Sequence, residues 1–126
     1  MIPFLRRFGI AIAYAVCIFI LSSIPTLRSP DLGLNFQDKI YHIIEYGIFG
    51  FLLQRGASAV SGSSFKRFLL VFFIGVLYAA SDEIHQLFVP GRQCDFFDFL
   101  SDAAGMCAGQ IFFCINKKFL KSRKKN

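Results

Sequence analysis

The side chains of this chain that could do chemistry fall into three short clusters. Seven of the eight acidic residues and both histidines belong to them. The clusters contain Asp38, Lys39, His42 and Glu45; Asp82, Glu83, His85 and Gln86; and Arg92, Asp95, Asp98 and Asp102. Each cluster lies at one end of an apolar segment, where ionisable groups are costly unless they pair or serve a function. These residues are therefore the candidates for a functional site.

Residue types and helical spacing leave three chemistries open. His42 with Glu45, and Asp82 with His85, place an imidazole and a carboxylate on one helical face, as metal-binding helical bundles do. Crowded carboxylates beside a histidine also suit metal-free acid–base catalysis or ligand binding. In the third alternative the network only holds helix ends together. Two positive charges among seven carboxylates argue against the purely structural alternative, and a divalent metal is compatible with the residues without being required.

Four apolar stretches must position the clusters. They span residues 8–24, 40–53, 68–80 and 96–115 in a 126-residue chain that is 55% hydrophobic, with mean hydropathy +0.53. A helix that crosses a membrane needs about 20 residues, with roughly 17 as the lower limit. The first stretch meets this limit without a charge, and the others meet it when extended through their polar clusters. We therefore predict an all-α membrane protein with four transmembrane helices, the alternative being a compact soluble bundle.

The basic residues predict how these helices are oriented. With both termini inside, eleven of the fourteen Lys and Arg residues fall on one side, and only Arg28, Lys39 and Arg92 fall on the other. This asymmetry is typical of a multi-pass membrane protein with both termini cytoplasmic. It also accounts for the net charge of +6, so no nucleic-acid partner is expected.

Local signals place the helix ends. The run Val89-Pro90-Gly91-Arg92 predicts a type II turn, which makes the third and fourth helices antiparallel neighbours and turns Arg92 back over the polar face. Asn35 or Asp38 is expected to cap the second helix. Gly105 and Gly109 are spaced for close helix packing, which we expect within the bundle rather than in a dimer.

The chain resembles a known family in two sequence runs and in the polar residues that follow the second run. These are DKIYHIIEYG from residue 38 and SDEIHQLFVPGR from residue 81, followed by Asp95, Asp98 and SDAAG from residue 101. Together they resemble the VanZ-like family of small bacterial membrane proteins, over about residues 5–115. The resemblance implies that the polar residues of the three clusters are shared family positions. It also implies a cell-envelope role, since the name-giving member confers low-level resistance to the glycopeptide teicoplanin.

We expect a VanZ-like transmembrane domain over residues 4–116 and a basic cytoplasmic tail over residues 117–126. The clusters should form an outward-facing pocket that binds, and in one alternative modifies, a membrane lipid or a lipid-linked cell-wall precursor. In the other alternative the protein is a non-catalytic accessory or structural protein. The catalytic candidates are Asp82, Glu83, His85, Asp98 and His42. The ligand-binding candidates are Asp38, Lys39, Glu45, Gln86, Arg92, Asp95 and Asp102. Six of these, His42, Glu45, Asp82, His85, Asp98 and Asp102, are expected to line one cavity.

Overall fold

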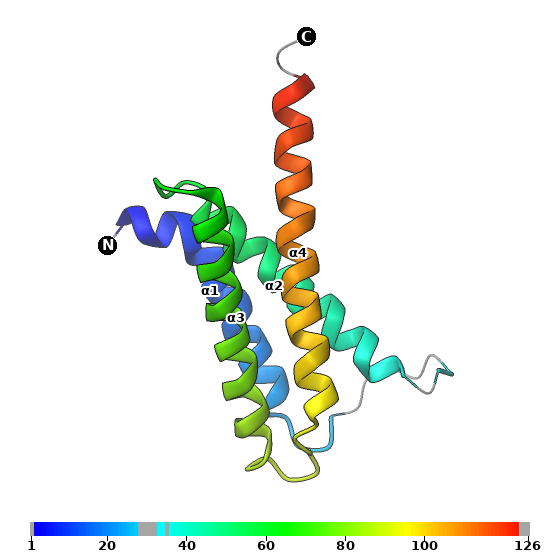
Figure 1. Cartoon of the computed structure of the whole chain (residues 1–126). Helices are drawn as coiled ribbons and strands as arrows, with labels where there is room; N and C mark the ends of the chain where they lie inside the picture. The colour runs from blue at the N-terminus through cyan, green and yellow to red at the C-terminus, as the bar shows by residue number, and fades with distance from the viewer. Residues whose placement is uncertain (1, 28–32, 35, 124–126) are drawn as a thin grey trace.

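The computed structural model describes residues 2–27, 33–34 and 36–123, and these residues form four helices and no strand. The helices are α1 (Ile2–Ser22), α2 (Gln37–Ala57), α3 (Ser64–Gln86) and α4 (Phe96–Arg123). α1 and α3 run side by side, α4 lies beside α3, and α2 crosses the bundle obliquely (Figure 1). The most extensive packing is that of α2 on α4. The prediction of an all-α chain is confirmed.

The helices alternate in direction, so the bundle has two chemically different ends (Figure 1). The polar end, as we call it, holds the last turns of α1 and α3 and the first turns of α2 and α4. The basic end holds the opposite helix termini, with Arg6, Arg7, Arg55, Lys66 and Arg67. All three clusters are therefore at one end, as the up-and-down arrangement predicted. α4 continues beyond the bundle through the first residues of the expected tail and ends at Arg123.

Two helical segments, Pro3–Ser22 and Ser64–Gln86, are long and apolar enough to cross a membrane. Their outward faces expose large apolar side chains along most of their length, among them Ile10, Phe65 and Leu77. Such faces suit contact with lipid. α2 and α4 carry charged residues in their first and last turns. Four membrane crossings and the cytoplasmic termini accordingly stay predictions.

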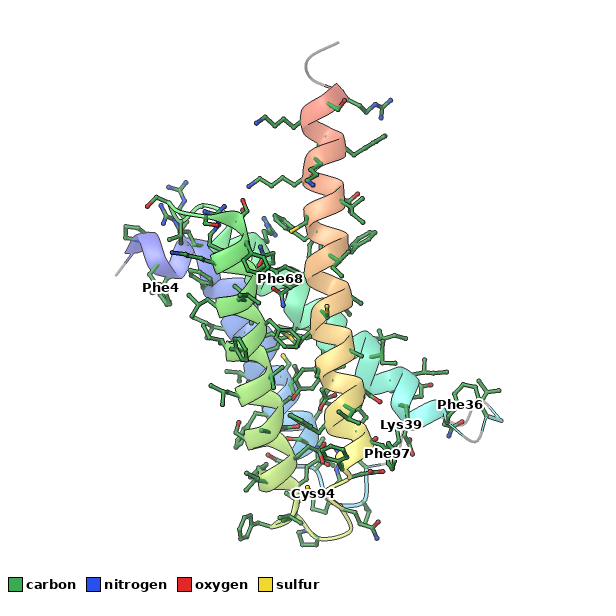
Figure 2. The ribbon with its side chains drawn as sticks, viewed as in Figure 1. Phe4, Phe36, Lys39, Phe68, Cys94 and Phe97 are labelled. Carbon is green, nitrogen blue, oxygen red and sulfur yellow. The ribbon has the colours of Figure 1, made fainter. Side chains whose placement is uncertain are left out.

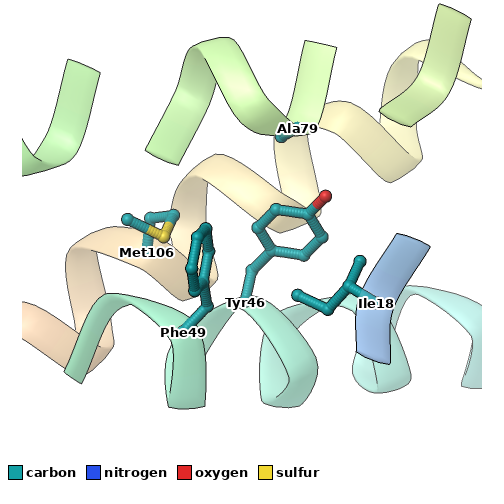
Figure 3. Packing of buried hydrophobic residues seen from close by; sticks show 5 residues of the cluster. All are labelled: Ile18, Tyr46, Phe49, Ala79 and Met106. Atoms are coloured by element: carbon teal, nitrogen blue, oxygen red, sulfur yellow. The ribbon is translucent and has the colours of Figure 1, made fainter. Parts of the chain in front are cut away.

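All four helices contribute a side chain to the apolar core (Figure 3). Tyr46 and Phe49 of α2 pack at the centre with Ile18, Ala79 and Met106 from the other three helices. Tyr46 and Phe49 meet edge to face, with ring centroids 6.1 Å apart. This core packs α2 against the other three helices.

Glycines allow α2 and α4 to cross at close range. A Cβ atom on Gly109 would lie 1.9 Å from the carbonyl oxygen of Gly47, and one on Gly105 would lie 2.4 Å from that of Ile43. No larger residue fits at either position without separating the helices. The predicted role of Gly105 and Gly109 in packing within the bundle is confirmed.

The turn between α3 and α4 has the predicted geometry. Gly91 has φ = 78°, and the amide of Arg92 donates to the carbonyl of Val89 at 3.1 Å, as a type II turn requires. The amide of Thr26 donates to the carbonyl of Pro90 at 3.2 Å, which fastens the turn to the chain after α1.

The predicted cap of α2 by Asp38 is wrong. The N-cap residue is Phe36, which makes no side-chain cap, and Asp38 lies inside the first turn because the helix begins at Gln37. The other cap candidate, Asn35, lies outside the described residues. Arg28, one of the three basic residues expected on the side opposite the termini, lies outside them as well. Asp38 still suits the helix dipole, since its carboxylate is near the positive end.

Candidate functional site

His42 is held between two aspartates of α4. Its Nδ1 atom lies 2.8 Å from Oδ1 of Asp102, and its Nε2 atom lies 3.8 Å from Oδ2 of Asp98. Asp98 and Asp102 are four residues apart and so share the face of α4 that meets α2. Asp102 is 1% exposed. Two of the three aspartates of the third cluster therefore meet the same histidine.

Lys39 lies on the solvent side of His42, Asp98 and Asp102. Its ammonium donates to Oδ2 of Asp95 at 2.7 Å and also to Oδ1 of Asp98. Figure 2 shows Lys39 beside the start of α4, near Phe97. The hydrogen bond from Lys39 holds the pKa of Asp95 below its usual value. Lys39 is thus engaged by carboxylates and is less available to a ligand than expected.

Glu83 reaches the same group from α3. The backbone amide of Asp95 donates to Oε2 of Glu83 at 3.0 Å, while Oε1 of Glu83 is buried without a hydrogen-bond partner among the described residues.

Three residues of this region could hold a metal ion: one ligand atom each from His42, Glu83 and Asp98 lies within 4.8 Å of the other two. We call the whole group the carboxylate cluster; it contains Lys39, His42, Glu83, Asp95, Asp98 and Asp102.

A cavity of about 350 Å³ lies next to this cluster, between α1, α2 and α3. His42 lines it and so belongs to both the cavity and the cluster. The other polar lining comes from Tyr14, Ser22, Tyr41, Glu45, Asp82, Gln86 and Arg92, and the apolar lining from Ile18, Leu21, Leu27, Ile44 and Ile48. The cavity therefore combines an apolar side with charged groups of both signs.

Asp82 is fixed inside the cavity wall by two neighbours. Ser22 donates its hydroxyl to Oδ1 at 2.6 Å, and Gln86, one turn further along α3, donates from Nε2 to Oδ2 at 3.2 Å. Asp82 is 6% exposed. Both oxygens are thus occupied, which orients the carboxylate rigidly.

Arg92 lies over the same cavity, as the turn predicted. Its Nη2 donates to the carbonyl of Leu21 at 2.9 Å, while its Nε is buried without a hydrogen-bond partner among the described residues. Asp82 and Glu45 line the cavity with it. The guanidinium of Arg92 therefore still has an N–H group without an acceptor, and it lines the same cavity as the carboxylates of Asp82 and Glu45.

The expectation that one cavity would collect six residues is wrong for three of them, Asp98, Asp102 and His85. The side chain of His85 lies against α1. Its ring stacks on Phe19 with centroids 4.6 Å apart, and its Nε2 lies 3.0 Å from the hydroxyl of Ser23. It is not among the described residues that line the cavity. Residues two apart on a helix point about 200° apart, so His85 faces α1 when Glu83 faces α4.

The other expected residues are divided between two neighbouring places. His42, Glu45 and Asp82 line the cavity, whereas Asp98 and Asp102 lie against His42 in the carboxylate cluster. Asp38 is exposed in the first turn of α2 and joins neither group. The functional roles of all these residues stay predictions.

Sequence reasoning missed the contribution of α1. Ser22 bonds Asp82, Ser23 bonds His85, and the hydroxyl of Tyr14 donates to the carbonyl of Glu45 at 3.2 Å. The available signal was the pair Ser22-Ser23 at the end of an otherwise apolar segment, at the same end of the bundle as the clusters.

Comparison with known proteins gives one relationship. Searches of curated proteins and of solved structures give no match. A family model described as VanZ/LLP1 matches residues 8–117, which include the carboxylate cluster, the cavity and the turn between α3 and α4. With its two membrane-compatible helices, the chain is a membrane protein and belongs to the VanZ/LLP1 family.

Proposed function

We propose that this protein binds an amphiphilic molecule of the cell envelope, an envelope lipid or a lipid-linked cell-wall precursor, in the cavity at the polar end. The observation that carries the proposal is Arg92, which lines the cavity and has a buried Nε–H without a hydrogen-bond partner among the described residues. Leaving a charged donor buried and unpaired is costly. A phosphate or carboxylate matches the planar guanidinium fork, so an anionic head group is the favoured ligand chemistry.

The apolar side of the cavity supports an amphiphile over a fully polar solute. Ile18 and Leu21 of α1 and Ile44 and Ile48 of α2 contribute to its lining. A volume of about 350 Å³ is at the lower end of the roughly 300–1,000 Å³ typical of small-molecule pockets. The space suits a head group with the first part of an acyl or prenyl chain, and the remainder would lie in the surrounding bilayer.

The carboxylates of the cavity favour a head group that also carries hydroxyl or amino groups. Glu45 can accept a hydrogen bond from the ligand, and His42 can accept one or carry a proton. Asp82 lies beside them, with its orientation fixed by Ser22 and Gln86. In an enzyme, His42 would transfer a proton to or from a ligand anchored by Arg92. In an accessory protein, the same groups would only recognise the ligand.

The family relationship extends the proposal to antibiotic resistance. The name-giving member of the family confers low-level resistance to the glycopeptide teicoplanin. We propose that the present protein affects teicoplanin susceptibility through the molecule bound in its cavity.

The test measures lipid binding by native mass spectrometry of the detergent-purified protein, with anionic phospholipid and a polyprenyl phosphate as probes. Arg92→Gln should weaken binding at least tenfold, and Arg92→Lys should weaken it less because the charge is kept. Arg123→Gln, which changes an exposed arginine beyond the basic end, is the matched control and should bind as the wild type does. Equal binding by Arg92→Gln, with an unchanged melting temperature, would overturn the proposal.

The same variants separate an enzyme from an accessory protein. Mass analysis of the bound ligand after incubation reports a chemical change directly. An enzyme should lose that change in His42→Gln while ligand still binds, whereas an accessory protein should show no change and graded losses of affinity. Expression in a susceptible bacterium should raise the inhibitory concentration of teicoplanin, and Arg92→Gln should remove the increase.

A further inference from the structure

We propose that His42, Glu83 and Asp98 bind one divalent metal ion at the polar end, next to the cavity. The three residues come from α2, α3 and α4, so the site joins three of the four helices. The inference does not depend on the ligand proposed above, because it concerns the carboxylate cluster and can be tested with the metal alone. With a metal bound, both ring nitrogens of His42 would be engaged, so His42 would hold the ion instead of carrying a proton.

The spacing of the donor atoms suits a small ion. One donor from each residue lies within 4.8 Å of the other two, and Nε2 of His42 is 3.8 Å from Oδ2 of Asp98. A tetrahedral ion with ligands at about 2.1 Å holds its donors roughly 3.4 Å apart. Small side-chain rotations would therefore bring the three donors onto an ion without moving a helix.

Asp102 prepares His42 for this role. Nδ1 of His42 lies 2.8 Å from Oδ1 of Asp102, so a neutral ring that donates this hydrogen bond presents the lone pair of Nε2 to Glu83 and Asp98. A carboxylate behind a ligating histidine is the usual arrangement in metal sites, where it fixes the tautomer and the ring orientation. Asp102 is 1% exposed, so its orientation is set by packing.

The state of Glu83 points to a missing partner independently of this spacing. Glu83 is 3% exposed, and its Oε1 is buried without a hydrogen-bond donor among the described residues. Its other oxygen accepts from the amide of Asp95 at 3.0 Å, which holds the carboxylate in place. A buried carboxylate with an unpaired oxygen is unfavourable. A metal ion would supply the missing contact.

The local charge also favours a cation. The carboxylate cluster contains four carboxylates, those of Glu83, Asp95, Asp98 and Asp102, and one ammonium, that of Lys39, which gives a formal charge of −3 with His42 neutral. One divalent ion would reduce this to −1. Lys39 contacts Oδ1 of Asp98, which leaves Oδ2 for the metal. The competing arrangement is a protonated His42 that pairs with Asp98 and Asp102 and needs no metal.

The donor set narrows the identity of the ion. One imidazole nitrogen with two carboxylate oxygens suits Zn²⁺ or Mn²⁺ better than Ca²⁺, which prefers oxygen ligands alone. Three protein ligands leave a coordination position open, as in catalytic rather than structural zinc sites. His42 also lines the cavity, which places the ion beside the space proposed for the head group.

The experiment uses full-length protein in detergent, stripped with a chelator and titrated with Zn²⁺ or Mn²⁺ while free metal is monitored. One equivalent should bind. Binding should weaken at least tenfold in His42→Gln, Glu83→Gln and Asp98→Asn, and about 10–100-fold in Asp102→Asn, which removes only the supporting carboxylate. His85→Gln and Asp38→Asn are matched controls, because they change the other histidine and an exposed aspartate, and should keep full affinity.

A spectroscopic measurement on the wild-type protein covers the case in which a variant fails to fold. Pulsed electron paramagnetic resonance of bound Mn²⁺ should show coupling to one imidazole nitrogen, and His85→Gln should leave this coupling unchanged. Absence of stoichiometric binding, absence of the nitrogen coupling, or loss of the coupling in His85→Gln would each overturn the proposal. Equal affinity of folded His42→Gln and wild type would do so as well.

Discussion

The imidazole of His42 and the carboxylate of Asp102 join α2 to α4 through a 2.8 Å contact between Nδ1 and Oδ1. Asp102 is almost fully buried at this point, and His42 is partly buried. A hydrogen bond to a charged group in such a place contributes about 1.5–3 kcal/mol. The contact therefore holds together the two helices that pack most extensively on each other.

The first prediction follows from this pair. His42→Ala and Asp102→Ala should each lower the free energy of unfolding, and a double-mutant cycle should give a coupling energy of about 1–3 kcal/mol. Unfolding in mixed micelles measures all four proteins under the same conditions. Asp38→Ala is the control and should change stability by less than about 0.5 kcal/mol, because Asp38 is exposed. A coupling energy near zero would mean that the contact carries no stability.

Much of the architecture was predictable from the sequence, for local reasons. The spacing of apolar and polar residues predicted four helices with the clusters at one end, and the Pro90-Gly91 pair predicted a type II turn that the structure contains. These features depend on the chain within a few residues of each position. They are insensitive to how far each helix rotates about its own axis.

The division of the candidate site depends on that rotation and could not be predicted. Glu83 and His85 are two residues apart, so only one of them can face the carboxylate cluster once α3 is packed. The structure turns Glu83 toward it and leaves His85 on Phe19 of α1. The sequence contains no local signal for this choice, because it depends on how α3 packs on the other helices, with Ala79 in the core and Gly75 against Met106.

A second prediction concerns the crossing of α2 and α4. Gly109→Ala should destabilise the protein by about 1–3 kcal/mol, because the added Cβ would lie 1.9 Å from the carbonyl oxygen of Gly47. Gly9→Ala is the matched control. No atom lies within 4 Å of a Cβ there, so the substitution should be neutral or stabilising by up to about 1 kcal/mol through helix propensity. Melting temperatures in one detergent compare the two, and equal effects would contradict the tight crossing.

A third prediction concerns acid stability. The hydrogen bond from Lys39 lowers the pKa of Asp95 in the folded protein. A carboxyl group of this kind stabilises the fold above its unfolded pKa, near 3.9, and the stabilisation is lost as pH falls through the lower folded pKa. Asp95→Asn should therefore reduce the loss of melting temperature between about pH 5 and pH 2. Lys39→Met should reduce it in part, since it removes the hydrogen bond from Lys39 and leaves the one that the amide of Phe97 donates to Asp95. A full wild-type pH dependence in Lys39→Met would show that Lys39 is not the cause.

The last prediction tests which side of the membrane holds the polar end. Cys94 is exposed in the segment between α3 and α4 (Figure 2). Cys17 is also exposed but lies within the membrane-compatible segment of α1, and Cys107 and Cys114 are half-buried within α4. If the positive-inside asymmetry sets the orientation, a membrane-impermeant maleimide should label Cys94 in intact cells and should not label Cys94→Ser. Desolvation, together with the nearby Glu83 carboxylate, raises the pKa of the Cys94 thiol. Labelling should consequently be faster at alkaline than at neutral pH, because the thiolate is the reactive form.

The control for this experiment places a thiol at the opposite end. Ser61→Cys in the Cys94→Ser background lies in the connection between α2 and α3, beside the arginines and lysine of the basic end. It should be labelled only after the membrane is permeabilised. The reverse pattern, with Ser61→Cys labelled in intact cells and Cys94 protected, would move the cavity and the carboxylate cluster to the cytoplasmic side. An external head group would then have no access to Arg92, and the proposed envelope ligand would have to be abandoned.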